Sequence, residues 1–195
     1  FEDEHGKSLA ESLDQEPIVG FVLNLEEEFV KVVILSGAER IREGMIAKGT
    51  GKTLSIPVSS ACIGRVVNAL GEPIDGKGAL KEESRFPIER IAFGVMDRAG
   101  VDTPLHTGIK AIDSMIPVGR GQRELIIGDR STGKTSIALD TILNQLNEPE
   151  ATRPICIYVA IGQKESKIAR IVGDLAERGA LAYTIVVVAG SSETA

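Results

Sequence analysis

Two patterns of apolar residues divide the chain. After residue 103, short apolar runs suited to buried strands alternate with stretches in which apolar residues recur at helical spacing. The predicted strands are 125–127, 155–161 and 184–189, and the predicted helices are 107–116, a helix that follows Lys134, and 165–181. Strands and helices in alternation are typical of parallel βαβ units with right-handed crossovers. We therefore predict an α/β domain built on a parallel sheet.

The first part of the chain has a different, β-rich pattern. Two apolar runs, 18–25 and 29–35, flank a charged turn of three glutamates and predict a hairpin. Residues 54–58 and 62–70 add short strands, and the turn cluster GEPIDGKG follows. The pattern predicts a β domain over 1–70, a linker over 71–103 and the α/β domain over 104–195. The acidic residues 1–17 are expected to form an exposed loop, and without an initiator Met the true start is expected upstream.

Composition and charge exclude several functions. Hydrophobic residues make up 43% of the 195 residues, which is ample for a packed core. The net charge is −6 and no basic block is present, which disfavours binding of nucleic acid. No apolar run approaches the ~20 residues of a membrane-spanning helix. Cys62 and Cys156 lie far apart in apolar runs without a CxxC motif, so we expect buried thiols in a reducing compartment.

One motif carries specific chemistry. Gly128 and Gly133 bracket four residues and are followed by Lys134 and Thr135, which is the GxxxxGK[ST] spacing of a phosphate-binding loop. Glycine lets main-chain N–H groups close around an anion, and the helix that follows adds its free N–H groups and the positive end of its dipole. Lys134 would place its charge on the outer phosphates, and the Thr135 hydroxyl would bind Mg²⁺.

Other candidate residues have simpler interpretations. A second GKT, at 51–53, has Ile46 where the motif requires glycine, and it is predicted to be a turn. His106 lies before a predicted helix that Thr107 would cap, and a lone histidine there is expected to be a packing or surface residue. Asp113 is expected to be a solvated or hydrogen-bonded carboxylate.

The longer runs around the motif resemble a known family. The run TGIKAIDSMIPVGRGQRELIIGDRSTGKTSIALDTILNQ, followed by CIYVAIGQK and TIVVVA, is similar to the α subunits of F-type ATP synthases. Upstream, GFVLNLEEEFVKVVILSGAERIREG and IGRVVNALGEPIDGKG resemble the end of the β-barrel and the linker of those subunits. The resemblance implies a RecA-like P-loop NTPase fold: a parallel sheet with helices on both faces, preceded by part of a small β-barrel domain. Residues 1–70 would be the barrel part, 71–103 the linker and 104–195 the first part of the nucleotide-binding domain.

The resemblance also implies a site that binds a nucleotide without hydrolysing it. In the catalytic subunits of this family a glutamate polarises the attacking water; the matching residue here is Gln163, whose neutral amide orients water but is a negligible base. No residue is therefore assigned a catalytic role. The cofactors would be ATP or ADP with Mg²⁺, and Thr135 would be the Mg²⁺ ligand. The implied nucleotide-binding residues are Gly128, Asp129, Arg130, Ser131, Thr132, Gly133, Lys134, Thr135, Ser136 and Gln163.

Two positions in the loop are left open. The family usually has Gln where this chain has Ser131, whose short hydroxyl is expected to leave the backbone cradle intact. Arg130 would either add charge beside the phosphates or face a neighbouring subunit. The Walker-B carboxylate, an arginine inserted into the neighbouring catalytic site and a C-terminal helical domain would all follow Ala195.

As a member of this family, the protein would be the regulatory, non-catalytic α subunit of a proton-translocating ATP synthase, which makes ATP from ADP and phosphate with the energy of an ion gradient. Its partners would be the β subunit, in an alternating α/β ring, and the γ and δ subunits, with no nucleic acid. The complex would be peripheral to a membrane, on the cytoplasmic face of the bacterial plasma membrane or on the matrix or stroma side in an organelle.

Two alternatives share the same core. A self-sufficient P-loop ATPase of the secretion or flagellar-export type would be expected to carry Glu at the position of Gln163. A Rho-like RNA translocase needs a basic path for RNA, which the acidic composition disfavours.

Overall fold

The computed structural model describes residues 18–35 and 37–190. The acidic stretch 1–17, expected to be an exposed loop, lies outside the described residues. Among the described residues, no helix is long and apolar enough to cross a membrane.

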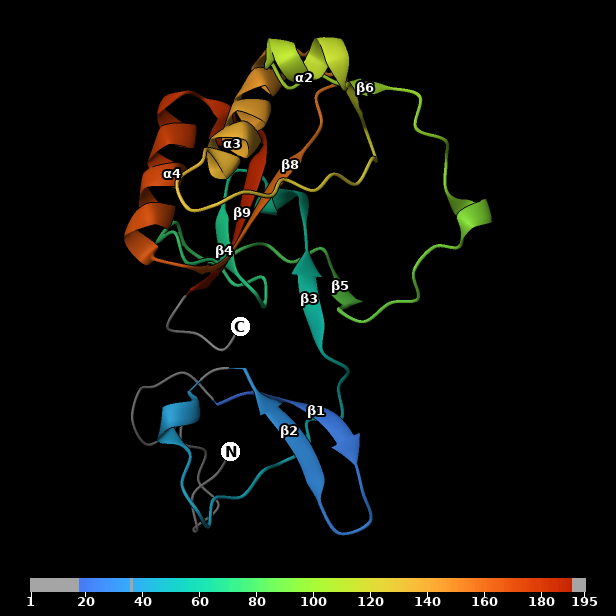
Figure 1. Cartoon of the computed structure of the whole chain (residues 1–195). Helices are drawn as coiled ribbons and strands as arrows, with labels where there is room; N and C mark the ends of the chain where they lie inside the picture. Colours follow the sequence, from blue (N-terminus) through green and yellow to red (C-terminus); the bar gives the residue numbers. More distant parts are fainter. Residues whose placement is uncertain (1–17, 36, 191–195) are drawn as a thin grey trace.

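The α/β part is built on a three-stranded parallel sheet in the order β4 (Val66–Asn68), β9 (Thr184–Gly190), β8 (Cys156–Gln163). The chain passes from β8 to β9 through α4 (Glu165–Glu177) and the short helix η5 (Ala180–Tyr183). The predicted strand–helix–strand unit is therefore confirmed, with α4 ending earlier than predicted. Before β8 lie α3 (Lys134–Asn144) and η4 (Gln145–Asn147). Figure 1 shows α3 and α4 beside β8 and β9.

The core lies between one face of this sheet and the two helices. Alternation along β8 buries Tyr158 and Ala160 on that face, against Ile168, Ile171 and Leu175 of α4. Ile142 of α3 joins the same cluster. The opposite face of β8 carries residues that are more than half exposed: Ile157, Val159 and Ile161. In the part of the chain that the structure describes, the sheet thus carries this helix layer on one face, and the second helix layer stays a prediction.

The strand predicted to run into the phosphate loop is not formed. Residues 123–128 are irregular, and Leu125 and Ile127 are 81% and 84% exposed. A strand is stable only when its backbone N–H and C=O groups find partners in a neighbouring strand. None of the strands in residues 18–35 and 37–190 pairs with this run, so the prediction of a strand at 125–127 is wrong for this structure.

The β elements of the first part form pairs of strands. β1 (Gly20–Leu25) and β2 (Val30–Ile34) form the predicted antiparallel hairpin, followed by the 3-10 turn η1 (Ala38–Arg40). β3 (Ser55–Val58) pairs with β5 (Ser84–Pro87), so a segment of the predicted linker is bound to the β domain. The remaining short elements are η2 (Ser60–Cys62), η3 (Val95–Asp97), β6 (Pro104–Leu105), α2 (Lys110–Met115) and β7 (Val118–Gly119), with β6 antiparallel to β7. Cys62 and Cys156 are free and half-buried.

An ion pair joins the turn cluster that follows β4 to the start of this strand. The sequence pattern places Val66–Asn68 within the β domain, whereas in the structure this strand pairs with β9. Just before it, Arg65 donates from Nε and Nη2 to the Asp75 carboxylate at 2.7 and 2.8 Å. Asp75 also accepts from the backbone N–H of Val66 at 3.2 Å, and its side chain is 7% exposed. The turn cluster that contains Asp75 is thereby held against β4; the domain boundaries themselves stay a prediction.

We predict that Leu175→Ala lowers the free energy of unfolding of the full chain by about 3 kcal/mol, because it leaves a cavity in the contact between α4 and the sheet. The Leu175 side chain is 1% exposed, whereas Glu177 on the same helix is exposed. Glu177→Ala is therefore the matched control and is expected to change stability by less than about 0.5 kcal/mol. Denaturant titrations measure both. An equal effect of the two variants would contradict the assigned core.

A second prediction concerns pH. The hydrogen bonds from Arg65 hold the pKa of Asp75 far below its ordinary value of 3.8. Because the folded pKa is lowered, the ion pair stabilises the fold fully above about pH 4, and the stabilisation is lost as the pH falls further. The difference in unfolding free energy between the wild type and Asp75→Asn should therefore be largest at neutral pH and shrink below pH 4. Denaturant titrations across this range measure it, and a difference independent of pH would rule out the proposed effect.

Candidate functional site

The GxxxxGKT loop is exposed and ends at the amino terminus of α3. Residues 128–132 are exposed, and the helix predicted after the loop is α3, which begins at Lys134. Gly133 is the residue before the helix and has φ 95°, in the left-handed region that favours glycine. Across the loop, the hydroxyl of Thr132 donates to the Asp129 carbonyl at 2.8 Å. A Cβ on Gly128 would lie 2.8 Å from that hydroxyl, so the close turn requires glycine at this position too.

The start of α3 supplies hydrogen-bond donors to an anion. The first intrahelical acceptor is the Gly133 carbonyl, which receives the N–H of Ile137 at 3.1 Å. The N–H groups of the residues between them have no acceptor within the helix, and they lie at the positive end of its dipole. Nζ of Lys134 folds back over the loop and donates to the carbonyls of Gly128 and Asp129. The ammonium group is therefore beside the loop, where a phosphate would attract it.

Ser131 has a conformation that is unusual for its residue type. Its φ of 61° is the one positive value among the described residues other than glycine. The left-handed region costs a residue with a Cβ roughly 1–2 kcal/mol. Consecutive residues that alternate between right- and left-handed conformations turn their N–H groups inward and form an anion-binding concavity. The strain at Ser131 lies within the loop that the motif predicts to bind phosphate.

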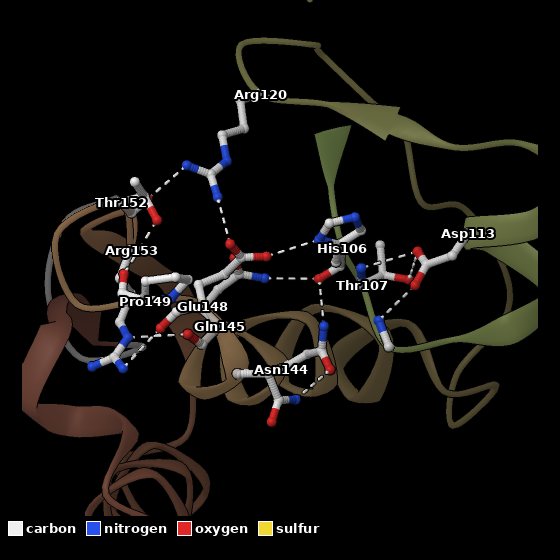
Figure 2. A network of polar contacts seen from close by, with 12 residues as sticks. His106, Thr107, Asp113, Arg120, Asn144, Gln145, Glu148, Pro149, Thr152 and Arg153 are labelled. Atoms are coloured by element: carbon white, nitrogen blue, oxygen red, sulfur yellow. Dashed lines mark hydrogen bonds and ion pairs between the residues drawn. The ribbon is translucent and has the colours of Figure 1, made fainter. Parts of the chain in front are cut away.

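A polar network fixes the other end of α3 (Figure 2). The side-chain amides of Asn144 and Gln145 both donate to the carbonyl of His106 at 2.8 Å. Gln145 is 1% exposed and also donates to the Thr141 carbonyl one turn earlier at 2.9 Å. The segment before α2 is thus joined to the carboxyl end of α3, which restrains the position of the helix whose amino end carries the loop.

Charged residues close the same network. His106 Nδ1 lies 2.8 Å from Glu148 Oε1, and Arg120 Nη2 lies 3.4 Å from Glu148 Oε2. The hydrogen bond from His106 is the main cause that lowers the pKa of Glu148. Arg120 also donates to the Thr152 carbonyl at 2.7 Å. His106 is therefore a structural contact residue, as predicted, and its partners come from segments that no local pattern links to it.

Asp113 organises the turn before α2. Its carboxylate accepts from the N–H and hydroxyl of Thr107, at 3.0 and 2.6 Å, and from the N–H of Gly108 at 2.9 Å. These bonds lower its pKa and confirm the predicted hydrogen-bonded carboxylate. The predicted capping residue is wrong, since α2 begins at Lys110 and Ile109 precedes it. The Thr107 hydroxyl accepts instead from the N–H of Ile109 at 3.1 Å, in a turn that comes before the helix.

Gln163, the last predicted site residue, is at the carboxyl end of β8. Its Nε2 donates to the hydroxyl of Tyr158 at 3.4 Å, whereas its Oε1 is buried without a hydrogen-bond partner among the described residues. The structure groups residues 128–136 in one loop and helix turn, and within the described residues no hydrogen bond joins them to Gln163. In Figure 1, α3 runs in the opposite direction to β8, so the amino end of α3 and the carboxyl end of β8 lie toward the same edge of the sheet. The contact with Tyr158 was not predicted.

The sequence is similar to those of known proteins. Residues 108–195 match the model of the ATP synthase alpha/beta family, nucleotide-binding domain. The chain is 58% identical over 176 residues to ATP synthase subunit alpha 1 of Nitrosomonas eutropha and 60% identical over 176 residues to ATP synthase subunit alpha of Nitrosomonas europaea. It is 58% identical over 175 residues to ATP synthase subunit alpha of Desulforudis audaxviator.

Each of these alignments covers 90% of this chain and 34% of the relative, so the chain spans about one third of the length of the curated relatives it matches. The likeness extends beyond the nucleotide-binding domain, because the family model begins at residue 108 whereas the relatives align over nearly the whole chain. The chain belongs to the family of ATP synthase alpha subunits.

Proposed function

We propose that the polypeptide carrying this sequence is the regulatory, non-catalytic nucleotide-binding subunit of a proton-translocating ATP synthase, which supports synthesis of ATP from ADP and phosphate. The observation that carries the proposal is the exposed loop at the amino end of α3, with Gly133 in the left-handed region and the Lys134 ammonium folded beside it. Backbone N–H groups at a helix start and a nearby ammonium suit a triphosphate.

The nucleotide would be ATP or ADP, and its phosphates would lie on residues 128–136. Main-chain N–H groups from Gly128 to Gly133 would surround the β- and γ-phosphates, and Lys134 would exchange its carbonyl contacts for phosphate oxygens. Thr135 is half-buried in the first turn of α3, where a hydroxyl suits one coordination position of Mg²⁺. The metal would neutralise charge on the phosphates, and the residues of the loop would hold the nucleotide in place.

The non-catalytic role follows from the chemistry of Gln163. Hydrolysis requires a group that orients the attacking water and, in this family, accepts its proton. The amide of Gln163 has an oxygen free to accept a hydrogen bond, but an amide is not a base at neutral pH. A bound nucleotide would therefore stay intact and act on the conformation of the assembly.

The same proposal includes a RecA-like fold for the α/β part, a partial β-barrel before it, and assembly with other subunits. A RecA-like sheet with helices on both faces is supported by the apolar, exposed face of β8, which suits a covering layer. The strand pair β1–β2 suits part of a small β-barrel in residues 1–70, with 71–103 as the linker and 104–195 as the start of the nucleotide-binding domain. The partners would be the β, γ and δ subunits, in a complex peripheral to a membrane.

We predict that Lys134→Ala weakens ATP binding to the full chain at least tenfold, because the ammonium that contacts the outer phosphates is lost. Lys52→Ala is the matched control: Lys52 belongs to the second GKT of the chain and is exposed in a turn. Isothermal titration calorimetry measures both affinities. An unchanged Kd for Lys134→Ala, or an equal loss in both variants, would reject the site.

We also expect the purified full chain to bind Mg-ATP without appreciable turnover, because Gln163 supplies no base. A phosphate-release assay on the subunit alone, and then with its partners, measures this. Brisk turnover by the subunit alone would favour the alternative, a self-sufficient ATPase of the export or secretion type. The Lys134→Ala variant serves as the control for contaminating ATPase, since it removes the site and not the background.

A further inference from the structure

The register between β8 and β9 changes immediately before Gln163. Up to Ile161 the strands pair residue by residue, with Tyr158 opposite Val186 and Ala160 opposite Val188. The next pair is Gln163 with Gly190, so Gly162 is an extra residue in β8. Strict alternation from Tyr158 and Ala160 would place residue 162 on the buried face and residue 163 on the exposed face. The extra residue reverses this order and places Gln163 on the buried face of the sheet, the same face as Tyr158.

Gly162 makes this reversal possible. Its φ of 63° lies in the left-handed region, which a residue with a Cβ adopts at a cost of roughly 1–2 kcal/mol. No atom lies within 4 Å of the position that a Cβ would occupy, so the constraint at this position comes from the backbone and not from crowding. The orientation of the Gln163 side chain therefore depends on the conformation of its neighbour.

The hydroxyl of Tyr158 then fixes which way the amide faces. Tyr158 is 8% exposed and belongs to the core cluster, so its ring is held by packing. Its hydroxyl accepts from Gln163 Nε2 at 3.4 Å, and the contact orients Oε1 away from the hydroxyl. Oε1 is buried and has no hydrogen-bond partner among the described residues. A buried acceptor of this kind costs stability unless a donor reaches it.

We propose that Tyr158 is a positioning residue for the nucleotide site: its hydroxyl, together with the bulge at Gly162, holds the Gln163 amide with Oε1 directed at a donor on the bound ligand. The inference rests on the proposed function. Phosphate oxygens at neutral pH only accept hydrogen bonds, so an amide oxygen cannot bind them directly. Mg²⁺ in nucleotide sites keeps several of its waters, and those waters are donors. The contribution of Tyr158 to nucleotide affinity should therefore require Mg²⁺.

The test is a double-mutant cycle with Tyr158→Phe, Gln163→Ala and the double variant, in the full chain. Calorimetry with ATP is carried out in excess Mg²⁺ and again in EDTA. Tyr158→Phe removes one hydroxyl and keeps the ring, and it should weaken Mg-ATP binding about three- to tenfold, with less than about a twofold change in EDTA. In the Gln163→Ala background, Tyr158→Phe should have no further effect, because the hydroxyl acts through that amide.

The bulge provides a second, independent variant. Gly162→Val should weaken Mg-ATP binding at least as much as Gln163→Ala, whereas Gly162→Asn should retain more affinity, because Asn tolerates the left-handed region. Three outcomes would each overturn the positioning role. They are equal losses of affinity in Gly162→Val and Gly162→Asn, additive losses of affinity in the double-mutant cycle, and wild-type affinity in Tyr158→Phe.

The failure of this inference can be distinguished from failure of the proposed function. Lys134→Ala should weaken ATP binding both with and without Mg²⁺, since its ammonium contacts the phosphates directly. Wild-type affinity in Lys134→Ala would reject the nucleotide site as a whole. A normal loss in Lys134→Ala together with wild-type affinity in Tyr158→Phe would reject the role of Tyr158 alone.

Discussion

The structure of the α/β part depends on one packing contact, between the buried face of β8 and β9 and the apolar sides of α3 and α4. Ala160 and Val186 are fully buried in this contact, and Leu175 of α4 is 1% exposed. Small residues in the strands bring the helices close to the sheet, and the removal of their apolar surface from water is the main driving force. The directions of α3 and β8, and hence the placement of the loop and of Gln163, follow from this contact.

Hydrogen bonds between polar groups fix a part of the position of α3 that apolar packing does not determine. Apolar contact sets the distance of α3 from the sheet, but it does not fix the helix along its own axis. The hydrogen bonds from Asn144 and Gln145 to the His106 carbonyl supply that restraint at the carboxyl end. The amino end is left with free donors, which is a requirement for binding an anion. The carboxyl end of the helix is thus joined to another segment of the protein, and the amino end is available to a ligand.

The elements that the sequence predicts correctly are those whose signals are local. The spacing of apolar residues in α4 predicts a helix because an amphipathic helix needs no distant partner to be recognised. The apolar runs of β8 and β9 predict strands for the same reason, and the spacing of apolar residues after the loop motif predicts the helix α3. The nucleotide-binding role of residues 128–136 stays a prediction, supported by the loop geometry.

The features that the sequence does not predict depend on distant partners. The run at 125–127 has the composition of a strand, but composition does not supply a neighbouring strand, and its side chains stay exposed. Val66–Asn68 pairs with a strand about 120 residues later in the chain. The bulge at Gly162, and with it the contact between Gln163 and Tyr158, appears only when the register is known. A glycine directly before Gln163 was the one available signal, because glycine inside a strand often marks a bulge.

The uncovered side of β8 has a practical consequence for handling this polypeptide. Among the described residues, β8 is at the edge of its sheet, and Ile157, Val159 and Ile161 present an apolar row to water. An edge strand with such a surface pairs readily with the same strand of another molecule and so begins aggregation. Concentrated solutions of the polypeptide would therefore favour aggregation, whereas a layer that covers this face of β8 would oppose it.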